Sequence, residues 1–267
     1  RGRMTTTALP YTSNMLNVKE LLLGRPAFLS GSSVSAHVYN LPDAYDDIDV
    51  FLPNMMALSS TAEHLLHEGF EVSDRFSRVW ARWLEYGTNK WHTNSLKLTH
   101  PDLGEVNLVH KLVGGHPVTS LSGVLESFDF GLLAIGYDLR LGELQDMRGY
   151  LFPGMRLDGP LPMMPNKAEA WKNGFISQYN GIREAGRYAK YCRYGYDMSL
   201  VKAQLLEGYQ AAAEYLHNRD KPEKQQLADI YDKLYLMILL DEIDEIHDAS
   251  QQIIYLDALD DIMEKLE

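Results

Sequence analysis

The apolar residues of the first 160 positions form short runs with two different periods. Helical spacing covers residues 15–23 and 57–67, and a glycine follows each stretch closely, which favours a helix end there. Runs typical of strands cover residues 27–29, 48–52, 79–86, 96–98 and 106–112. Short strands mixed with helices predict a mixed sheet with helices packed on it.

The pattern changes after three prolines, Pro160, Pro162 and Pro165. From residue 166 almost to the end, apolar positions recur at helical spacing, with Pro222 as the clear interruption. We therefore predict an α+β protein of two domains. A mixed α/β head covers residues 1–160, and an all-helical domain covers residues 161–267.

Composition and charge limit the partners of this chain. The 37 acidic residues outnumber the 25 basic ones, so the net charge is −12. A protein that binds nucleic acid over a broad surface is usually basic. Any contact of this acidic chain with RNA must therefore be local, and we expect no DNA partner. The single cysteine, Cys192, excludes an intramolecular disulfide and a Cys-rich zinc site. No apolar run reaches about 18 residues, so we expect no membrane partner and a cytoplasmic protein.

Two carboxylates at the start of a predicted strand carry the first chemical signal. Asp47 and Asp49 are two residues apart, so on a strand they share one face. Such a pair repels itself unless a cation lies between the carboxylates, and Mg²⁺ prefers these hard oxygen ligands. Upstream, the turn Gly31-Ser32-Ser33 precedes a short helix and offers backbone N–H groups and hydroxyls that suit phosphate. Together these segments favour phosphoryl or nucleotidyl transfer, although an acidic pair at a strand start is also a common surface feature.

These residues resemble a known family signature. Gly31-Ser32, a short helix, then Asp47-Ile48-Asp49-Val50 is similar to the motif of the polymerase-β-type nucleotidyltransferase superfamily. Residues 127–137, SFDFGLLAIGY, resemble the Arg-Arg-Asp-Phe-Thr-Ile-Asn-Ala-x-Ala-Tyr segment of CCA-adding enzymes and bacterial poly(A) polymerases. Residues 142–149 are similar to the Gly-x-Leu-x-Asp-x-x-Gly of that family, and residues 187–190 and 195–196 to its neck. The resemblance covers roughly residues 25–200.

The resemblance implies a nucleotidyltransferase-type sheet and a site with defined parts. Asp47 and Asp49 would hold two Mg²⁺ ions, and an NTP would be the substrate. Phosphate or nucleotide contacts are implied for Gly31, Ser32, Ser33, Asp129, Arg183, Arg187 and Lys190.

Several positions depart from the family pattern. Val34-Ser35-Ala36 stands where the family has Val-Arg-Asp, Ser127-Phe128 replaces its Arg-Arg, and Leu133 replaces its Asn. The superfamily often adds a third carboxylate on a later strand, where the expected slot here holds Asn107. Glu105 lies two residues earlier on the same face, so it is our candidate, with a solvated strand end as the alternative.

A basic segment precedes an acidic one in the second half. Residues 172–202 hold six basic and two acidic residues, whereas residues 221–267 hold 4 basic and 13 acidic ones. On a helix, Arg183, Arg187, Lys190 and Tyr194 share one face, which suits a nucleotide or an RNA strand. The alternative is that the tyrosines pack inward and the bases offset the acidic helices.

The residues thus favour a Mg²⁺-dependent nucleotidyltransferase that moves a nucleoside monophosphate from an NTP, such as ATP, to an acceptor hydroxyl. The family resemblance favours an RNA 3′ end as the acceptor. A protein side chain or a small molecule is the second choice, because of the acidic net charge. A degenerate fold that only binds a nucleotide or a partner is a further alternative.

Overall fold

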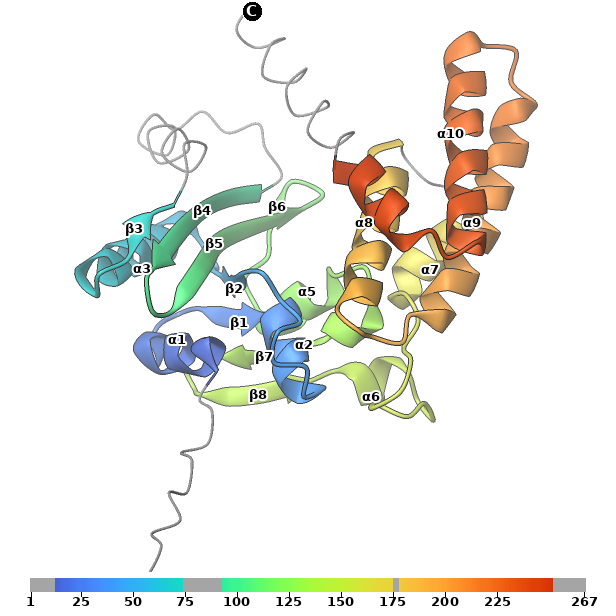
Figure 1. Ribbon diagram of the computed structural model, residues 1–267. Coiled ribbons are helices and arrows are strands. Elements are labelled where there is room, and N and C mark those ends of the chain that lie inside the picture. Colours follow the sequence, from blue (N-terminus) through green and yellow to red (C-terminus); the bar gives the residue numbers. More distant parts are fainter. Residues whose placement is uncertain (1–12, 74–92, 175–177, 252–267) are drawn as a thin grey trace, which may run out of the picture. The chain divides into compact units, whose positions relative to one another are not determined.

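The computed structural model describes residues 13–73, 93–174 and 178–251 (Figure 1). By its internal contacts the chain forms two compact units, each of them built from two segments. Unit 1 comprises Arg1–Val124 and Gly136–Gln145, and unit 2 comprises Leu125–Ile135 and Asp146–Glu267. The strand expected at residues 79–86 lies outside the described residues. The predicted domain boundary at residue 160 stays a prediction.

A mixed sheet forms the centre of unit 1. Its strands follow the order β3-β4-β5-β2-β1-β7-β8, and β6 pairs with β5. Their bounds are β1 Phe28–Ser30, β2 Ile48–Phe51, β3 Glu71–Val72, β4 Thr93–His100, β5 Gly104–Val113, β6 His116–Pro117, β7 Ile135–Asp138 and β8 Glu143–Asp146. Strands β2 and β5 run parallel, whereas the pairs β1–β2, β1–β7, β3–β4, β4–β5 and β5–β6 are antiparallel. The mixed sheet predicted from short apolar runs is confirmed.

The helices of the first part are α1 Asn14–Leu22, α2 Ser32–Val38, α3 Met55–His67 and α5 Leu121–Glu126. Helix α1 begins where the Ser13 hydroxyl accepts a hydrogen bond from the Leu16 N–H, and it buries Met15, Val18 and Leu22 at helical spacing. The Asn54 side chain caps α3 in the same way, by accepting from the Ala57 N–H at 2.8 Å. These helices and the sheet bury fully Leu29, Ile48, Leu52, Leu58, Leu65, Leu98 and Leu108.

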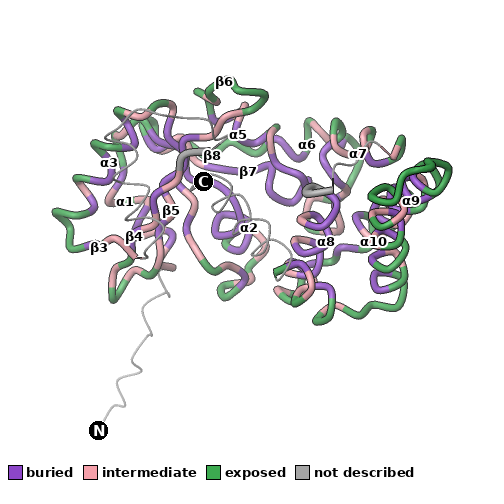
Figure 2. The backbone as a smooth tube through the Cα atoms, turned by 90° about the horizontal axis from the view of Figure 1, so that it is seen from above, coloured by how far each residue is buried: buried purple, intermediate pink, exposed green. Residues whose placement is uncertain are grey.

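Helices make up most of unit 2. They include η1 Gly131–Leu133, α6 Arg148–Leu151, α7 Pro165–Lys172, α8 Gln178–Arg193, α9 Ser199–His217 and α10 Pro222–Leu239. Helices α9 and α10 form a hairpin and run side by side (Figure 1). The turn that joins them is exposed, whereas their facing sides are buried (Figure 2). The helical second half is therefore confirmed.

Tyr209 is the centre of the core of unit 2. It is fully buried, and its ring centroid lies 5.0 Å from that of Trp171 and 5.5 Å from that of Tyr231. Its hydroxyl donates to the Gly181 carbonyl, which satisfies the polar end of the side chain. Gly208 lets α7 approach α9, because a Cβ there would lie 2.4 Å from the Trp171 ring.

None of the described helices is long and apolar enough to cross a membrane.

Candidate functional site

Three neighbouring strands of unit 1 bring the predicted carboxylates together. Asp49 on β2 lies opposite Asn107 on β5, and Asn107 lies opposite Lys97 on β4. Residues directly opposite each other in a sheet point to the same face. Glu105 is two positions before Asn107 on β5, so it points to the same face. Asp47 lies just before β2, and its contact with Lys97 places its carboxylate on that face as well.

Side-chain contacts join these residues into two sets on the same face of the sheet. The Asn107 Nδ2 donates to Asp49 Oδ1 at 3.0 Å. The Lys97 ammonium donates to Asp47 Oδ2 at 3.2 Å and to Glu105 Oε1 at 2.7 Å. The Asp47 side chain is 18% exposed, and those of Lys97 and Glu105 are each 36% exposed. Lys97 thus joins Asp47 to Glu105, and Asp49 lies on the same face of the sheet beside Asn107.

Lys97 is the member of this cluster that sequence reasoning missed. The run Leu96-Lys97-Leu98 predicted a strand. In the structure Leu96 and Leu98 are buried, so Lys97 between them points to the opposite face. The pattern gave no register between β4 and β5, so the face that Lys97 shares with Asn107 was not predictable. Burial alone would lower the pKa of Lys97. The hydrogen bond to Glu105 and the charges of Asp47 and Glu105 outweigh burial and raise that pKa.

The Gly31 turn lies directly beside the acidic pair. Ser30 on β1 is opposite Asp49, and Gly31 follows it with a φ of +92°. A Cβ at Gly31 would lie 2.8 Å from Asp49 Oδ2, so a side chain would collide with the carboxylate. Ser32 and Ser33 are buried at the start of α2, and the Ser33 hydroxyl has no hydrogen-bond partner among the described residues. The turn therefore offers open space at Gly31, which has no Cβ, and a Ser33 hydroxyl without a partner among the described residues.

The donor atoms of this cluster fit a divalent cation. Carboxylate oxygens from Asp47 and Asp49 are the hard ligands that Mg²⁺ takes. The Asn107 Oδ1 is buried and accepts no hydrogen bond from any described residue, so one more oxygen beside Asp49 lacks a partner. A buried oxygen without a donor is costly, and a cation near Asp49 would relieve that cost.

A second ionic cluster lies wholly within unit 2, around Asp129. The Asp129 carboxylate is 4% exposed. It pairs with Arg187, with the Lys167 ammonium at 3.2 Å and with the Arg183 guanidinium at 3.7 Å. Burial alone would raise the pKa of Asp129, but the charges of Arg187, Arg183 and Lys167 hold that pKa below its usual value. The structure therefore gathers three of the four predicted nucleotide-binding residues of this half.

Glu184 is a further member that the sequence analysis did not single out. Its Oε1 accepts from Arg183 Nη2 at 3.0 Å and lies 3.9 Å from Arg187 Nη1. Its Oε2 is buried and has no hydrogen-bond partner among the described residues. Burial, followed by the charge of Asp129, raises the pKa of Glu184 to about 7. The position three residues before Arg187 on α8 was a usable signal, because such residues are neighbours on a helix.

Lys190 and the tyrosines of this region make further contacts along α8 and just after it. The Lys190 ammonium lies over the Tyr194 ring, 5.5 Å from its centroid. Tyr188, Tyr191 and Tyr196 are buried, at 2%, 7% and 8% exposure. These three rings pack inward, as the alternative interpretation of the segment expected, and Tyr179 lies at a position whose side chain is not described.

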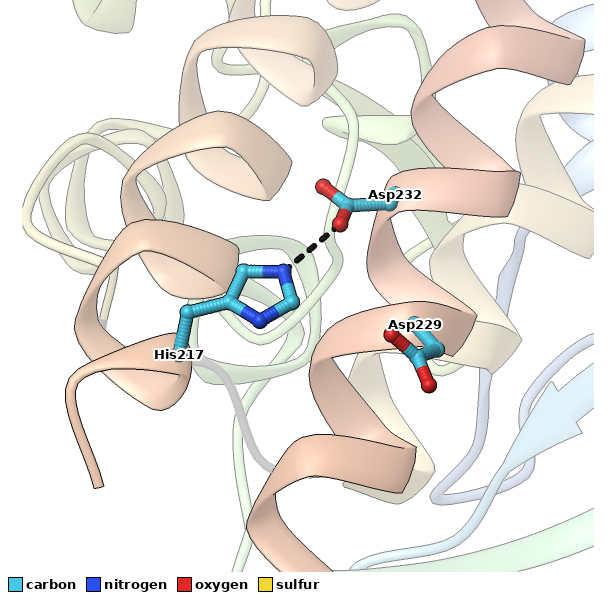
Figure 3. A group of neighbouring side chains, drawn as sticks. All are labelled: His217, Asp229 and Asp232. Atoms are coloured by element: carbon cyan, nitrogen blue, oxygen red, sulfur yellow. Dashed lines mark hydrogen bonds and ion pairs between the residues drawn. The ribbon is translucent and has the colours of Figure 1, made fainter. Parts of the chain in front are cut away.

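In the described part of the chain, one group of three side chains has its ligand atoms close enough together to hold a metal ion, and it lies in unit 2. His217 on α9 and Asp229 and Asp232 on α10 place one ligand atom each within 4.8 Å of one another (Figure 3). His217 Nε2 lies 2.7 Å from Asp232 Oδ2, and that hydrogen bond raises the pKa of His217. All three residues are exposed. The group links the two helices of the hairpin and lies outside the residues that sequence reasoning selected.

Comparison with known proteins gives resemblance at low identity. No family model and no curated protein matches the chain. A solved tRNA-processing enzyme with CTP is 16% identical at a TM-score of 0.42, covering 85% of this chain and 56% of that one. The Thermotoga maritima CCA-adding enzyme complexed with tRNA is 14% identical at a TM-score of 0.41, covering 86% and 53%. This chain spans little more than half the length of those enzymes, and at these scores the functional assignment rests on the site residues.

Proposed function

We propose that this chain is a Mg²⁺-dependent nucleotidyltransferase that moves a nucleoside monophosphate from an NTP to an acceptor hydroxyl. The observation that carries the proposal is the convergence of Asp47, Asp49 and Glu105 on one sheet face beside the Gly31 turn. Asp47 and Asp49 would hold the metal. Bound Mg²⁺ would supply the charge that acidifies the acceptor hydroxyl and neutralises the leaving pyrophosphate.

The chain itself supplies the groups that position the phosphates. Gly31 leaves room beside the Asp49 carboxylate. Any other residue type would place a Cβ in that room and would rarely adopt a φ of +92°. The Ser33 hydroxyl is buried without a described partner, and Ser32 is buried next to it. We assign the β- and γ-phosphates to Gly31, Ser32 and Ser33 on this basis.

For the acceptor we propose an RNA 3′ end. Two features support this choice: the sequence resemblance to CCA-adding enzymes, and the basic residues of α8. The Arg187 side chain is 42% exposed although it pairs with Asp129, so part of the side chain faces solvent. Lys190 is half-buried on the same helix. A protein side chain or a small molecule is the alternative acceptor, which the net charge of −12 favours.

A specific observation favours a second candidate function, nucleotide binding without transfer. Asn107 holds the position beside Asp49 where a carboxylate was expected, and the Lys97 ammonium already neutralises part of the acidic cluster. A site with fewer unpaired carboxylates holds metal less firmly. This candidate predicts NTP binding in the absence of any labelled product.

The test is incubation of the full chain with each of the four α-labelled NTPs and Mg²⁺, with short RNAs, cell lysate or neither. Transfer to RNA that Asp49→Asn abolishes is the expected result. Asp102→Asn, an exposed change on the turn between β4 and β5, is the matched control and should retain transfer. Label on a protein or on a small molecule would identify that molecule, in place of RNA, as the acceptor. Tight NTP binding with no product under any condition would reject transfer and establish the binding function.

The role of α8 is tested separately. Arg183, Arg187 and Lys190 are replaced together by Gln, and binding of a short RNA is followed across a salt series. Each lost phosphate contact should reduce the salt dependence by about one counterion. An unchanged salt slope would show that RNA does not bind this helix. Reduced NTP affinity with unchanged RNA affinity would assign these residues to the donor nucleotide.

A further inference from the structure

The α9–α10 hairpin of unit 2 brings an imidazole and two carboxylates together from two helices. His217 is the last residue of α9, and Asp229 and Asp232 lie three positions apart on α10, so the two aspartates share one side of that helix. One ligand atom of each residue lies within 4.8 Å of the other two. Figure 3 shows the imidazole facing the aspartates of the second helix. Residues from two segments thus converge on one point.

Helix packing fixes the backbone positions of these three residues. Each of them directly follows a buried residue, namely Leu216, Ala228 and Tyr231, which are 7%, 0% and 0% exposed. Successive residues on a helix are turned by about 100°, so the ligand residues lie at the edge of the buried interface. Their side chains still reach solvent. The backbone of the group is therefore preformed, and an ion could enter it with side-chain rotations alone.

Gln225 determines which nitrogen of His217 can bind an ion. The Gln225 Nε2 donates to the backbone carbonyls of His217, at 3.0 Å, and of Arg219, at 2.8 Å. Carbonyl oxygens only accept, so these bonds orient the amide and leave its Oε1 facing His217 Nδ1 at 3.3 Å. Nδ1 must then carry a hydrogen, and the lone pair of the neutral imidazole lies on Nε2. Metal-binding histidines share this arrangement, in which the second ring nitrogen donates to an oxygen.

The Nε2 atom of His217 lies 2.7 Å from Asp232 Oδ2. In the neutral imidazole two lone pairs would face each other at that contact, so a proton or a metal ion must lie between the two atoms. In a tetrahedral zinc site with bonds of about 2.0 Å, the ligand atoms lie about 3.3 Å apart. An ion therefore needs only a fraction of an ångström of movement at this contact. The Asp232 side chain is 54% exposed and can supply that movement.

We propose that His217, Asp229 and Asp232 form a Zn²⁺ site that joins the end of α9 to α10. One imidazole nitrogen and two carboxylate oxygens are ligands that Zn²⁺ takes, and water completes the tetrahedron on the exposed side. The imidazole separates this site from Asp47 and Asp49, whose oxygen ligands suit Mg²⁺. The unfolded chain does not hold these ligands together, so Zn²⁺ stabilises the folded hairpin. The site is independent of the proposed transferase.

The first experiment measures Zn²⁺ binding to the full chain by calorimetry, with an excess of Mg²⁺ to occupy sites made of oxygen alone. The wild type should bind Zn²⁺, and His217→Ala, Asp229→Asn and Asp232→Asn should each weaken that binding by about tenfold or more. Two controls make the same chemical changes at other exposed helical positions, His67→Ala on α3 and Asp248→Asn near the end of the described chain. Both should retain the wild-type affinity.

The second experiment measures the stabilisation of the hairpin by thermal unfolding. Zn²⁺ at about 100 times its dissociation constant should raise the unfolding midpoint of the wild type by about 5 °C or more. The three ligand variants should fold without Zn²⁺, because all three residues are exposed, and their midpoints should not rise. Asp49→Asn should show the full rise, because it changes only the proposed magnesium centre.

Three results would overturn the proposal. The first is a wild type that binds no Zn²⁺ when Mg²⁺ is in excess. The second is an Asp229→Asn or Asp232→Asn variant with an affinity within about twofold of the wild type, which would show that the replaced aspartate is not a ligand. The third is Zn²⁺ binding that leaves the unfolding midpoint unchanged. Loss of nucleotidyl transfer in Asp49→Asn bears only on the proposed function, so the two proposals fail separately.

Discussion

Gly31 and Asp49 approach each other so closely that a Cβ on Gly31 would lie 2.8 Å from Asp49 Oδ2. The backbone of Gly31 also has a φ of +92°, a conformation that residues with a side chain rarely adopt. Two independent constraints therefore require glycine at the end of β1. One concerns the backbone alone, and the other concerns the carboxylate that we assign to metal binding.

The first prediction separates these two constraints. Gly31→Ala should lower the free energy of unfolding by about 1–3 kcal/mol and also weaken Mn²⁺ binding, because the new methyl displaces the Asp49 carboxylate. Gly24→Ala is the matched control: Gly24 has a φ of +82°, but nothing lies within 4 Å of its Cβ position. It should lose stability and keep Mn²⁺ affinity. Denaturant unfolding and Mn²⁺ titration measure both effects, and normal Mn²⁺ affinity in Gly31→Ala would contradict the assignment of Asp49.

The second prediction concerns the position beside Asp49. Asn107→Asp replaces the amide that donates to Asp49 Oδ1 with a carboxylate that repels it. We expect a lower unfolding temperature without divalent cations and a larger rise on addition of Mg²⁺ than in the wild type, since the cation binds the folded state. Asn107→Leu, which removes the hydrogen bond without adding charge, should lower the unfolding temperature, which should then rise on addition of Mg²⁺ no more than in the wild type. Equal responses of the two variants would contradict the metal centre.

The third prediction concerns the ionic cluster of unit 2. Asp129→Asn removes the buried charge that Arg187 and Lys167 share. Asp129 is buried, but Arg187 and Lys167 are 42% and 33% exposed and can be solvated, so the loss should be about 1–3 kcal/mol, less than for a wholly buried pair. Asp158→Asn breaks the exposed pair with Arg156 and should leave the unfolding midpoint unchanged. A denaturant series compares the two, and equal midpoints for both variants would show that Asp129 makes no net contribution.

The fourth prediction is a pH dependence set by Glu184. Its pKa is about 7 in the folded chain against 4.5 ordinarily, so between these values the folded state holds the proton more firmly than the unfolded one. The contribution of Glu184 to stability therefore falls as the pH rises through this window. Glu184→Gln removes that loss, so its stability relative to the wild type should rise by about 3 kcal/mol between pH 4.5 and pH 8.

Denaturant unfolding at several pH values measures that difference. Glu207→Gln, an exposed change on α9, is the control for the chemical substitution. A difference between Glu184→Gln and the wild type that stays constant with pH would show that Glu184 does not titrate in this range.

The local elements of this fold were predictable because their signals are local. The spacing of Met15, Val18 and Leu22 and the glycine after them predicted α1, and the run around Val50 predicted β2. The shared face of Asp47 and Asp49 followed from strand geometry alone. The side chains that those residues meet did not follow, because strand register is set by contacts between distant segments.

Lys97 and Asp129 illustrate that limit. Lys97 contacts Asp47 across 50 positions, and Asp129 contacts Arg187 across 58 positions. Helical spacing did place Arg183 and Arg187 on one face, but it could not show that a carboxylate from another segment neutralises both. The function of a basic stripe depends on such internal partners, so charge counts along the sequence overstated the positive charge available to a polyanion.

The parallel pairing of β2 with β5 also governs when the site can assemble. Parallel neighbours need a long crossover, and here α3, β3 and β4 all lie between the two strands in the chain. A chain synthesised from its N-terminus exposes Asp47 and Asp49 long before Lys97 and Asn107 emerge. Until then Asp47 lacks the Lys97 ammonium and Asp49 lacks the Asn107 amide. Closure of this crossover, a slow non-local step, therefore sets the moment at which a nascent chain first acquires its proposed metal site.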